Sequence, residues 1–374
     1  MPLTRSLCNS AKQNDEVQLV VQDKIEVYLE RKFRTSRSFA TRNAYRIAIN
    51  RFIDFVRIHY NLDFSTLLLQ IKESKRDPID ILDDYYSHLS EGEKRLSNST
   101  ICLYFIVAKD FLNSLGCKIY SEDIRQRFRL PKKTQVYEEG ITKETINRII
   151  RFSNPKLATA ILMICSSGMR ISEMVQLRLE DIDFAKSPTT IRIRAETAKT
   201  RETRITCISS EATNALQDYI ERYHITSKFL FLKNFHETEE VFVKDVICIR
   251  QSLERQIKRV LENIPELNKK NENGRNAIHF HAFRAWFKTQ VTDAHQSDFA
   301  ESLMGHKSLK LVYYRQNAKA RAETYLGIEH ALTIADTEKI DENYSELQKD
   351  NLELRGIVDG LSKQLRNLEK RIVD

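Results

Sequence analysis

Apolar residues in the first third of the chain recur at helical spacing. The clearest helix is predicted over about residues 41–59, where one face is apolar and the opposite face is polar and basic. The apolar positions are Tyr45, Ala48, Ile49, Phe52 and Val56, and the opposite positions are Arg42, Arg46, Asn50 and Arg57. Shorter helical patterns follow at 80–89 and 99–115, the second between a Ser97-Asn98-Ser99 capping cluster and Gly116. We therefore expect a helical domain over residues 24–120, after a polar lead-in at 1–23.

The pattern changes after residue 120. Residues 121–140 are rich in basic side chains, contain Pro131 and lack apolar periodicity, which is typical of a linker. A helix is expected after Thr142, and another apolar helix up to Cys165. Strict alternation then predicts two strands, Thr190–Arg194 and Arg204–Ile208, joined by a polar hairpin before helices resume at Ser210. Residues 141–335 are thus predicted to form a second domain, mainly helical with a small antiparallel β-sheet.

The apolar residues of the last forty positions have a different spacing. Their apolar positions alternate three and four residues apart, as in the heptad repeat of a coiled coil. The positions are Ile340, Tyr344, Leu347, Asn351, Leu354, Val358, Leu361, Leu365, Leu368 and Ile372. Leucines at one seam position, with Asn351 at the other, favour a parallel dimer through a coiled coil at 336–374. The alternative is a single amphipathic helix folded back on its own domain.

Charge and composition narrow the possible partners. The 374 residues carry a net charge of +8, and residues 31–57 contain eight basic side chains against one acidic one. A surface that carries mainly positive charge favours contact with phosphates. The candidate DNA contacts are Arg42, Arg46 and Arg57. The alternative is an ordinary solvated surface. The six cysteines are far apart and form no metal-ligand cluster, which favours a reducing cytoplasm. No apolar run is long enough to cross a membrane and no export signal is recognisable.

Three short segments contain the residues that predict chemistry. Arg170 follows a glycine turn at Gly168, and His281 and Arg284 are three residues apart on one predicted helical face. Near the end of the second domain the chain reads Gly305-His306, followed by Tyr313-Tyr314-Arg315. Together with Lys199, these side chains could hold a phosphodiester and attack it.

The order Arg, Lys, His-x-x-Arg, Gly-His and Tyr-Arg resembles the tyrosine recombinase, or phage integrase, family over about residues 24–330. The resemblance implies a helical core-binding domain and a catalytic domain that form a clamp around double-stranded DNA. It also implies that four protomers assemble on two recombination sites. Within the family, the chain resembles archaeal or viral mobile-element integrases. These enzymes act on DNA in a prokaryotic cell.

The same resemblance assigns roles to individual residues. Arg170 and Arg284 would grip the nonbridging oxygens of the scissile phosphate, and His306 would hydrogen-bond to it. Lys199 would protonate the departing 5′-oxygen, and His281 would help to remove the proton of the nucleophile, Tyr314. Glu173 would support the site indirectly. No cofactor and no metal is implied, because the arginines supply the positive charge.

Some alternatives remain open from the sequence. Tyr314 lies eight residues after His306, where nine is common in the family, and Tyr313 is a rival nucleophile. Integration or excision of a mobile element is the leading functional hypothesis. A type IB topoisomerase-like enzyme would use similar residues, and a non-catalytic coiled-coil DNA-binding regulator is the alternative outside the enzymes.

Overall fold

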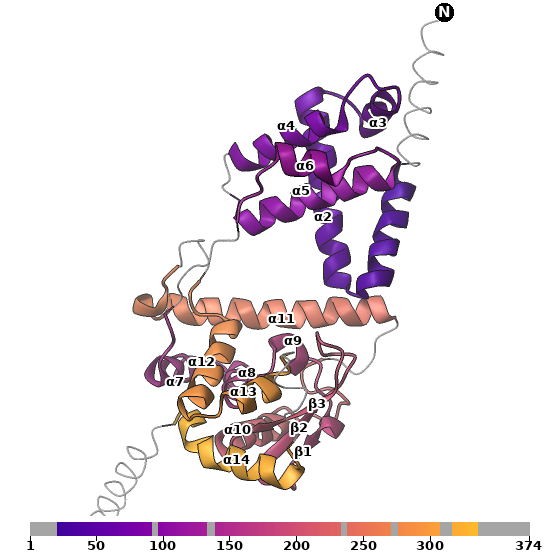
Figure 1. Cartoon of the computed structure of the whole chain (residues 1–374). Coiled ribbons are helices and arrows are strands. Elements are labelled where there is room, and N and C mark those ends of the chain that lie inside the picture. Colours follow the sequence, from indigo (N-terminus) through magenta and orange to yellow (C-terminus); the bar gives the residue numbers. More distant parts are fainter. Residues whose placement is uncertain are drawn as a thin grey trace, which may run out of the picture. The chain divides into compact units, whose positions relative to one another are not determined.

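The computed structural model describes residues 21–91, 96–132, 139–232, 238–270, 276–306 and 316–335. The chain divides into two compact units, Met1–Tyr137 and Glu138–Asp374, and each has a hydrophobic core of its own. Helices dominate both units, and one three-stranded antiparallel sheet is present in the described part of the second (Figure 1). The prediction of a mainly helical chain with a small antiparallel sheet is confirmed. The coiled coil expected at 336–374 lies outside the described residues.

The first unit is built from helices alone in its described residues. A helix over residues 21–36 is followed by α2 (Phe39–Tyr60), α3 (Phe64–Lys72), α4 (Pro78–Glu91), α5 (Asn98–Ser114) and α6 (Ser121–Arg127). The core contains large aromatic side chains from several of these helices, among them Phe52, Tyr85, Phe105 and Phe111. The helical face predicted at 41–59 is confirmed, because Ala48, Ile49, Phe52 and Val56 are buried.

Capping side chains explain where two of these helices begin. The Ser38 hydroxyl accepts a hydrogen bond from the backbone N–H of Thr41, and the Ser97 hydroxyl accepts one from that of Thr100. Such bonds satisfy donors that the first turn of a helix leaves unpaired. After α5 the chain reverses at Gly116, whose φ of 89° lies in the left-handed region that glycine adopts at little cost.

Residues 121–128 differ from the expected linker. They begin with α6, and Arg127 forms ion pairs with Asp80 at 2.6 Å and with Asp83 at 3.4 Å on α4. The next residue, Phe128, is buried against the ring of Phe105 at a centroid distance of 4.8 Å. Tertiary packing of one aromatic residue thus attaches this basic segment to the helical unit.

The second unit surrounds the buried helix α8 (Pro155–Ser167), which packs against α10 (Ser210–Arg222), α12 (Phe280–Asp293) and strand β3 (Figure 1). Its apolar side chains and even its last two serines are buried, so it forms the centre of this core. The remaining helical elements are α7 (Lys143–Arg151), α9 (Ile171–Met174), η1 (Leu179–Asp181), α11 (Glu239–Glu262), η2 (Pro265–Leu267), α13 (Ser297–Met304) and α14 (Ala318–Leu332).

The sheet of this unit has the order β1-β2-β3, with β1 at Ile182–Asp183, β2 at Thr189–Ile193 and β3 at Arg204–Ile208. In the antiparallel pair β2 and β3, Thr189 lies opposite Ile208 and Ile193 lies opposite Arg204. The predicted hairpin is confirmed, with β2 starting and ending one residue earlier than expected. Its connecting turn carries Lys199.

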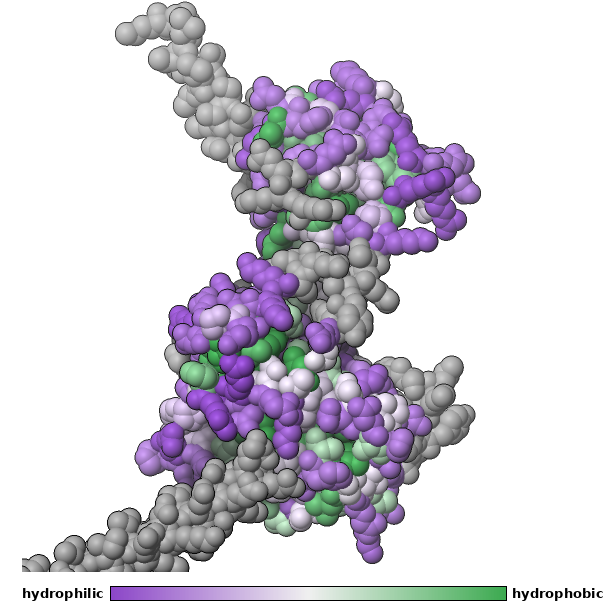
Figure 2. Space-filling model, turned by 90° about the vertical axis from the view of Figure 1, so that its left-hand side faces the viewer, coloured by the Kyte–Doolittle hydropathy of each residue, from purple (hydrophilic) through white to green (hydrophobic). Residues whose placement is uncertain are grey.

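Figure 2 shows one face on which hydrophilic residues predominate and hydrophobic residues form small, separate patches. Isolated apolar side chains on a surface are normal in folded proteins. Among the described helices, none has the length and apolarity needed to span a bilayer.

Candidate active site

Arg170 is placed by a reversal of the chain at the end of α8. Gly168 terminates that helix with a φ of 62°, and Arg170 is the N-cap residue of the short helix α9. A Cβ atom at Gly168 would lie 2.3 Å from a ring carbon of Phe287, which is closer than nonbonded carbons approach. Glycine is therefore required here both by the backbone angle and by the space available. As predicted, Arg170 follows a glycine turn at the start of a helix.

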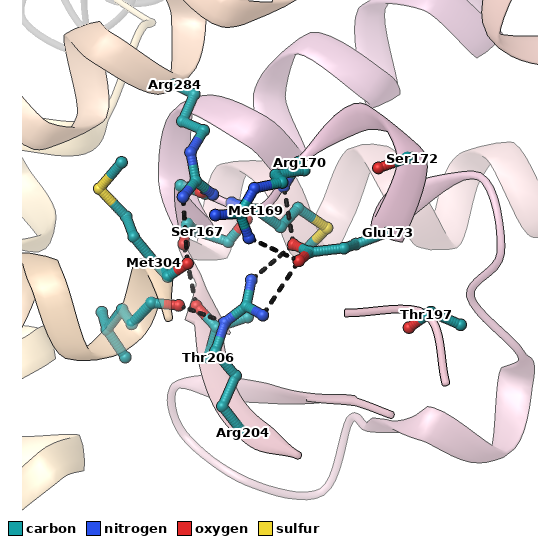
Figure 3. A network of polar contacts seen from close by, with 12 residues as sticks. Ser167, Met169, Arg170, Ser172, Glu173, Thr197, Arg204, Thr206, Arg284 and Met304 are labelled. Atoms are coloured by element: carbon teal, nitrogen blue, oxygen red, sulfur yellow. Dashed lines mark hydrogen bonds and ion pairs between the residues drawn. The ribbon is translucent and has the colours of Figure 1, made fainter. Parts of the chain in front are cut away.

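Glu173 is the buried carboxylate of the site. Its Oε2 accepts a hydrogen bond from the Arg170 backbone N–H at 2.9 Å, and its Oε1 accepts one from Arg170 Nη1 at 2.9 Å. Two further hydrogen bonds come from Arg204, whose Nη1 and Nη2 lie 3.1 and 2.6 Å from the two carboxylate oxygens (Figure 3). Burial would raise the pKa of Glu173, but the bonds from Arg204 and Arg170 outweigh burial and lower it. The carboxylate is thus ionised at neutral pH and orients both arginines.

Arg284 approaches Arg170 from helix α12 and is only 3% exposed. Its Nη1 donates to the Gly168 carbonyl, and its Nη2 donates to the Met304 carbonyl at 3.0 Å (Figure 3). Burial, followed by repulsion from Arg170, lowers the pKa of Arg284 to about 10. Among the residues that the structure describes, no carboxylate lies within ion-pair distance of this guanidinium. Arg284 is therefore a buried cation whose charge an incoming anion would stabilise.

His306 follows the left-handed residue Gly305 at the end of α13. Its Nε2 lies 2.9 Å from Arg284 Nη2, and its Nδ1 lies 2.5 Å from Oε2 of Glu301. A guanidinium can only donate hydrogen bonds, so Nε2 accepts here and the ring proton is on Nδ1, directed at Glu301.

Glu301 is in turn held by Lys288, whose Nζ lies 2.5 Å from Oε1. Burial would raise the pKa of Glu301, but the hydrogen bonds from Lys288 and His306 lower it. The carboxylate therefore remains charged at neutral pH and orients the histidine ring.

The other two predicted residues of this unit lie at exposed positions. Lys199 is exposed in the turn between β2 and β3, and in the described residues no hydrogen bond or ion pair joins it to the arginines. His281 is an exposed residue in the first turn of α12, with its ring stacked 6.2 Å from that of His279. The structure thus brings together Arg170, Glu173, Arg284 and His306. The predicted nucleophile Tyr314 and its rival Tyr313 lie outside the described residues.

Sequence reasoning missed three residues of this network: Arg204, Lys288 and Glu301. Arg204 could have been found, because strand alternation places it on the same face as the buried residues Thr206 and Ile208. Glu301 had no such signal. It lies five residues before His306, and only the turn at Gly305 brings the two side chains together.

The candidate DNA contacts of the first unit are paired with carboxylates. Glu26 lies 3.3 Å from Arg42 Nη2 and accepts two hydrogen bonds from Arg46, at 2.5 and 3.0 Å. Arg57 lies 3.9 Å from Asp54, and both side chains are largely exposed. The sequence-distant residue Glu26 therefore offsets part of the positive charge on α2.

Comparison with known proteins finds similar sequences and a similar fold. A sequence model described as the phage integrase family matches residues 139–321, which contain the arginine cluster and both tyrosines. This segment of the chain is similar to the phage integrase family, and the similar curated proteins are tyrosine recombinases.

Two curated relatives and one solved structure illustrate the similarity. A tyrosine recombinase of Pseudothermotoga lettingae is 24% identical over 185 residues, covering 47% of this chain and 63% of the relative. The tyrosine recombinase XerC of Roseiflexus sp. is 26% identical over 213 residues, covering 54% of this chain and 62% of the relative. The chain thus matches less than two thirds of the length of these relatives.

The fold resembles that of a lambda integrase, solved as a dimer bound to a COC′ core site. The TM-score is 0.51 at 14% identity, covering 79% of this chain and 98% of the other. At this level of identity the likeness concerns the fold.

Proposed function

We propose that this protein is a site-specific DNA recombinase that cleaves and rejoins strands of double-stranded DNA through a 3′-phosphotyrosyl intermediate. The observation that carries the proposal is the convergence of Arg170, the buried Arg284 and His306, with no described carboxylate within ion-pair distance of the Arg284 guanidinium. A scissile phosphate is an anion with the geometry that two guanidinium groups and an imidazole recognise.

In the proposed reaction the Tyr314 oxygen attacks phosphorus and the bond from phosphorus to the 5′-oxygen breaks. His281 accepts the tyrosine proton, and Lys199 gives a proton to the departing 5′-oxygen, which leaves as a hydroxyl group. Arg170 and Arg284 stabilise the charge that accumulates on the nonbridging oxygens. His306 donates to the phosphate once its Nε2 also carries a proton, because the lone pair that accepts from Arg284 cannot bond to a phosphate oxygen. One phosphodiester replaces another, so the covalent intermediate keeps the energy needed for rejoining and neither ATP nor another cofactor takes part.

A covalent trapping experiment tests this mechanism. Wild-type protein, Tyr314→Phe and Tyr313→Phe would each be incubated in EDTA with negatively supercoiled DNA, and protein-DNA adducts resolved on a denaturing gel. We expect an adduct that Tyr314→Phe alone abolishes, while DNA binding is retained. Loss with Tyr313→Phe alone would move the nucleophile by one residue. No adduct from the wild type, on DNA that carries the junctions of the host element, would contradict the proposal.

More specifically, we propose that the protein integrates or excises a mobile element in a prokaryotic cell. Strand exchange between two DNA sites separates a recombinase from a topoisomerase-like enzyme, which would relax supercoils without joining new partners. Exchange products on a two-site substrate are expected.

For assembly, we propose a dimer through a coiled coil at 336–374 and a tetramer on paired DNA sites. The heptad pattern of leucines supports the dimer. Deletion of residues 340–374 is expected to lower the mass of the DNA-free protein in light scattering after size exclusion. An unchanged mass would exclude the coiled-coil dimer.

A further inference from the structure

Arg204 occupies a central place in the site although no catalytic role is assigned to it. It is the first residue of β3, lies five residues after Lys199, and its side chain is 9% exposed. Its Nε donates to the Leu303 carbonyl at 2.7 Å, while Nη1 and Nη2 hold the two oxygens of Glu173 (Figure 3). Each of its three nitrogen atoms therefore donates to a protein group, and the protein holds the guanidinium in one orientation.

These contacts join three segments that are far apart in the sequence. Through Glu173, Arg204 is linked to both the backbone and the guanidinium of Arg170. Through the Leu303 carbonyl it is linked to the last turn of α13, immediately before His306. Through its own backbone it begins the strand that follows the Lys199 hairpin.

The turn at Gly305 rests directly on the Arg204 side chain. A Cβ atom at Gly305 would lie 2.8 Å from Cδ and 3.0 Å from Nε of Arg204, and the φ of Gly305 is 68°. A side chain at residue 305 would therefore displace Arg204, and glycine allows the turn before His306 to lie against it. A lysine would lack the planar fork that binds both carboxylate oxygens and the carbonyl at once.

We propose that Arg204 is a positioning residue for strand cleavage, and that its guanidinium, by bridging Glu173 and the Leu303 carbonyl, sets the spacing between Arg170 and His306. This inference rests on the proposed recombinase function. Arg204 acts through the side chains it holds, so its loss slows cleavage at saturating DNA and leaves DNA affinity nearly unchanged.

Arg194 provides a matched control. It directly follows β2, is 9% exposed, and binds the buried carboxylate of Asp181 at 3.1 Å and the Gln176 carbonyl at 2.8 Å. It is thus a second arginine that bridges a buried carboxylate and a carbonyl, without a contact to Arg170, Glu173 or His306 among the described residues.

The experiment compares Arg204→Lys, Arg204→Ala and Arg194→Lys with the wild type. Formation of the Tyr314 adduct is measured in single turnover on a nicked substrate, together with the Kd for DNA and the melting temperature. Misplacement of reacting groups by about 1 Å costs about 100-fold in rate. Below the melting temperature of Arg204→Lys, we expect its rate of adduct formation to fall by about that factor while its Kd for DNA is unchanged. The rate of Arg194→Lys should fall only slightly. Added guanidinium should restore part of the rate of Arg204→Ala.

Several outcomes would overturn the inference. Cleavage by Arg204→Lys at the wild-type rate would show that the bridge is not needed. If the cleavage rate fell in both lysine variants, and by more in the variant whose melting temperature fell more, Arg204 would have a role in stability alone. The wild-type protein tests the proposed function separately. If it forms no Tyr314-dependent adduct, both proposals fail. If it forms one, the results for the variants bear on Arg204 alone.

Discussion

The carboxylate of Glu301 lies 2.5 Å from Nδ1 of His306, and this contact determines which ring nitrogen faces Arg284. With the proton of Nδ1 directed at Glu301, Nε2 points its lone pair toward the arginine cluster. The orientation of the histidine is therefore controlled by a residue that the sequence did not single out.

Replacing Glu301 by glutamine should loosen this orientation. The amide keeps the shape of the side chain but removes its charge and can present a donor to the ring. We expect cleavage to slow by about 10- to 100-fold, as when a functional histidine loses the group that orients it, with DNA affinity retained. Nitrogen NMR of the His306 ring would detect a mixture of tautomers. Asp298→Asn, an exposed change on the same helix α13, is the control and should have neither effect.

Stability should fall in acid through Glu173 and Glu301. Both have a pKa lowered from the ordinary value of 4.5 in the folded protein. The unfolded chain therefore takes up protons first, so the stabilisation is complete above about pH 4.5 and is lost as the pH falls through the lowered pKa values. Urea unfolding at several pH values should show a smaller acid-side loss for Glu173→Gln than for the wild type. The exposed-site variant Glu323→Gln should keep the wild-type pH dependence.

Lys199→Ala should be rescued by a better leaving group. If Lys199 supplies the proton to the 5′-oxygen, its loss should slow cleavage of normal DNA by about 100- to 10,000-fold. A substrate with sulfur at the bridging 5′ position needs no such proton, because a thiolate leaves readily, and should be cleaved at nearly the wild-type rate. Arg170→Ala should remain slow on both substrates. Equal defects of Lys199→Ala on both would argue against a role as the acid.

Gly168→Ala should destabilise the second unit. The left-handed backbone alone costs roughly 1–2 kcal/mol with a side chain, and the clash with Phe287 should add roughly 1–3 kcal/mol. Gly327 on α14 has open space around it, so Gly327→Ala should raise the unfolding free energy by roughly 0.5–1 kcal/mol. Denaturant unfolding of the two variants measures both changes, and equal effects would refute the argument.

Glu26→Gln should strengthen DNA binding if α2 contacts phosphates. The substitution frees charge on Arg42 and Arg46 that Glu26 now offsets. Arg42→Ala should lower the slope of log Kd against log salt by about 1. Glu30→Gln removes one negative charge one helical turn away and is the matched control, because Glu30 pairs with Arg34 instead. Similar gains from both glutamine variants would indicate a general effect of net charge.

Local patterns were sufficient for much of the fold. Amphipathic spacing identified α2, capping serines and Gly116 marked the limits of α5, and alternation identified β2 and β3. These features depend on residues within a few positions of one another. The same methods assigned Phe128 to a linker, because its burial depends on Phe105, a residue from another helix.

The sequence by itself determined which candidate site side chains are present, and in what order, from Arg170 to Tyr314. Only the tertiary structure decided that Arg204 and Glu301 hold Arg170 and His306 in place, and that Arg284 is a buried cation without a carboxylate partner among the described residues. The physical reason is that hydrogen bonds and burial depend on distances in space, and the bond from Arg204 to Leu303 joins residues 99 positions apart. A pattern of neighbouring residues carries no information about such a contact.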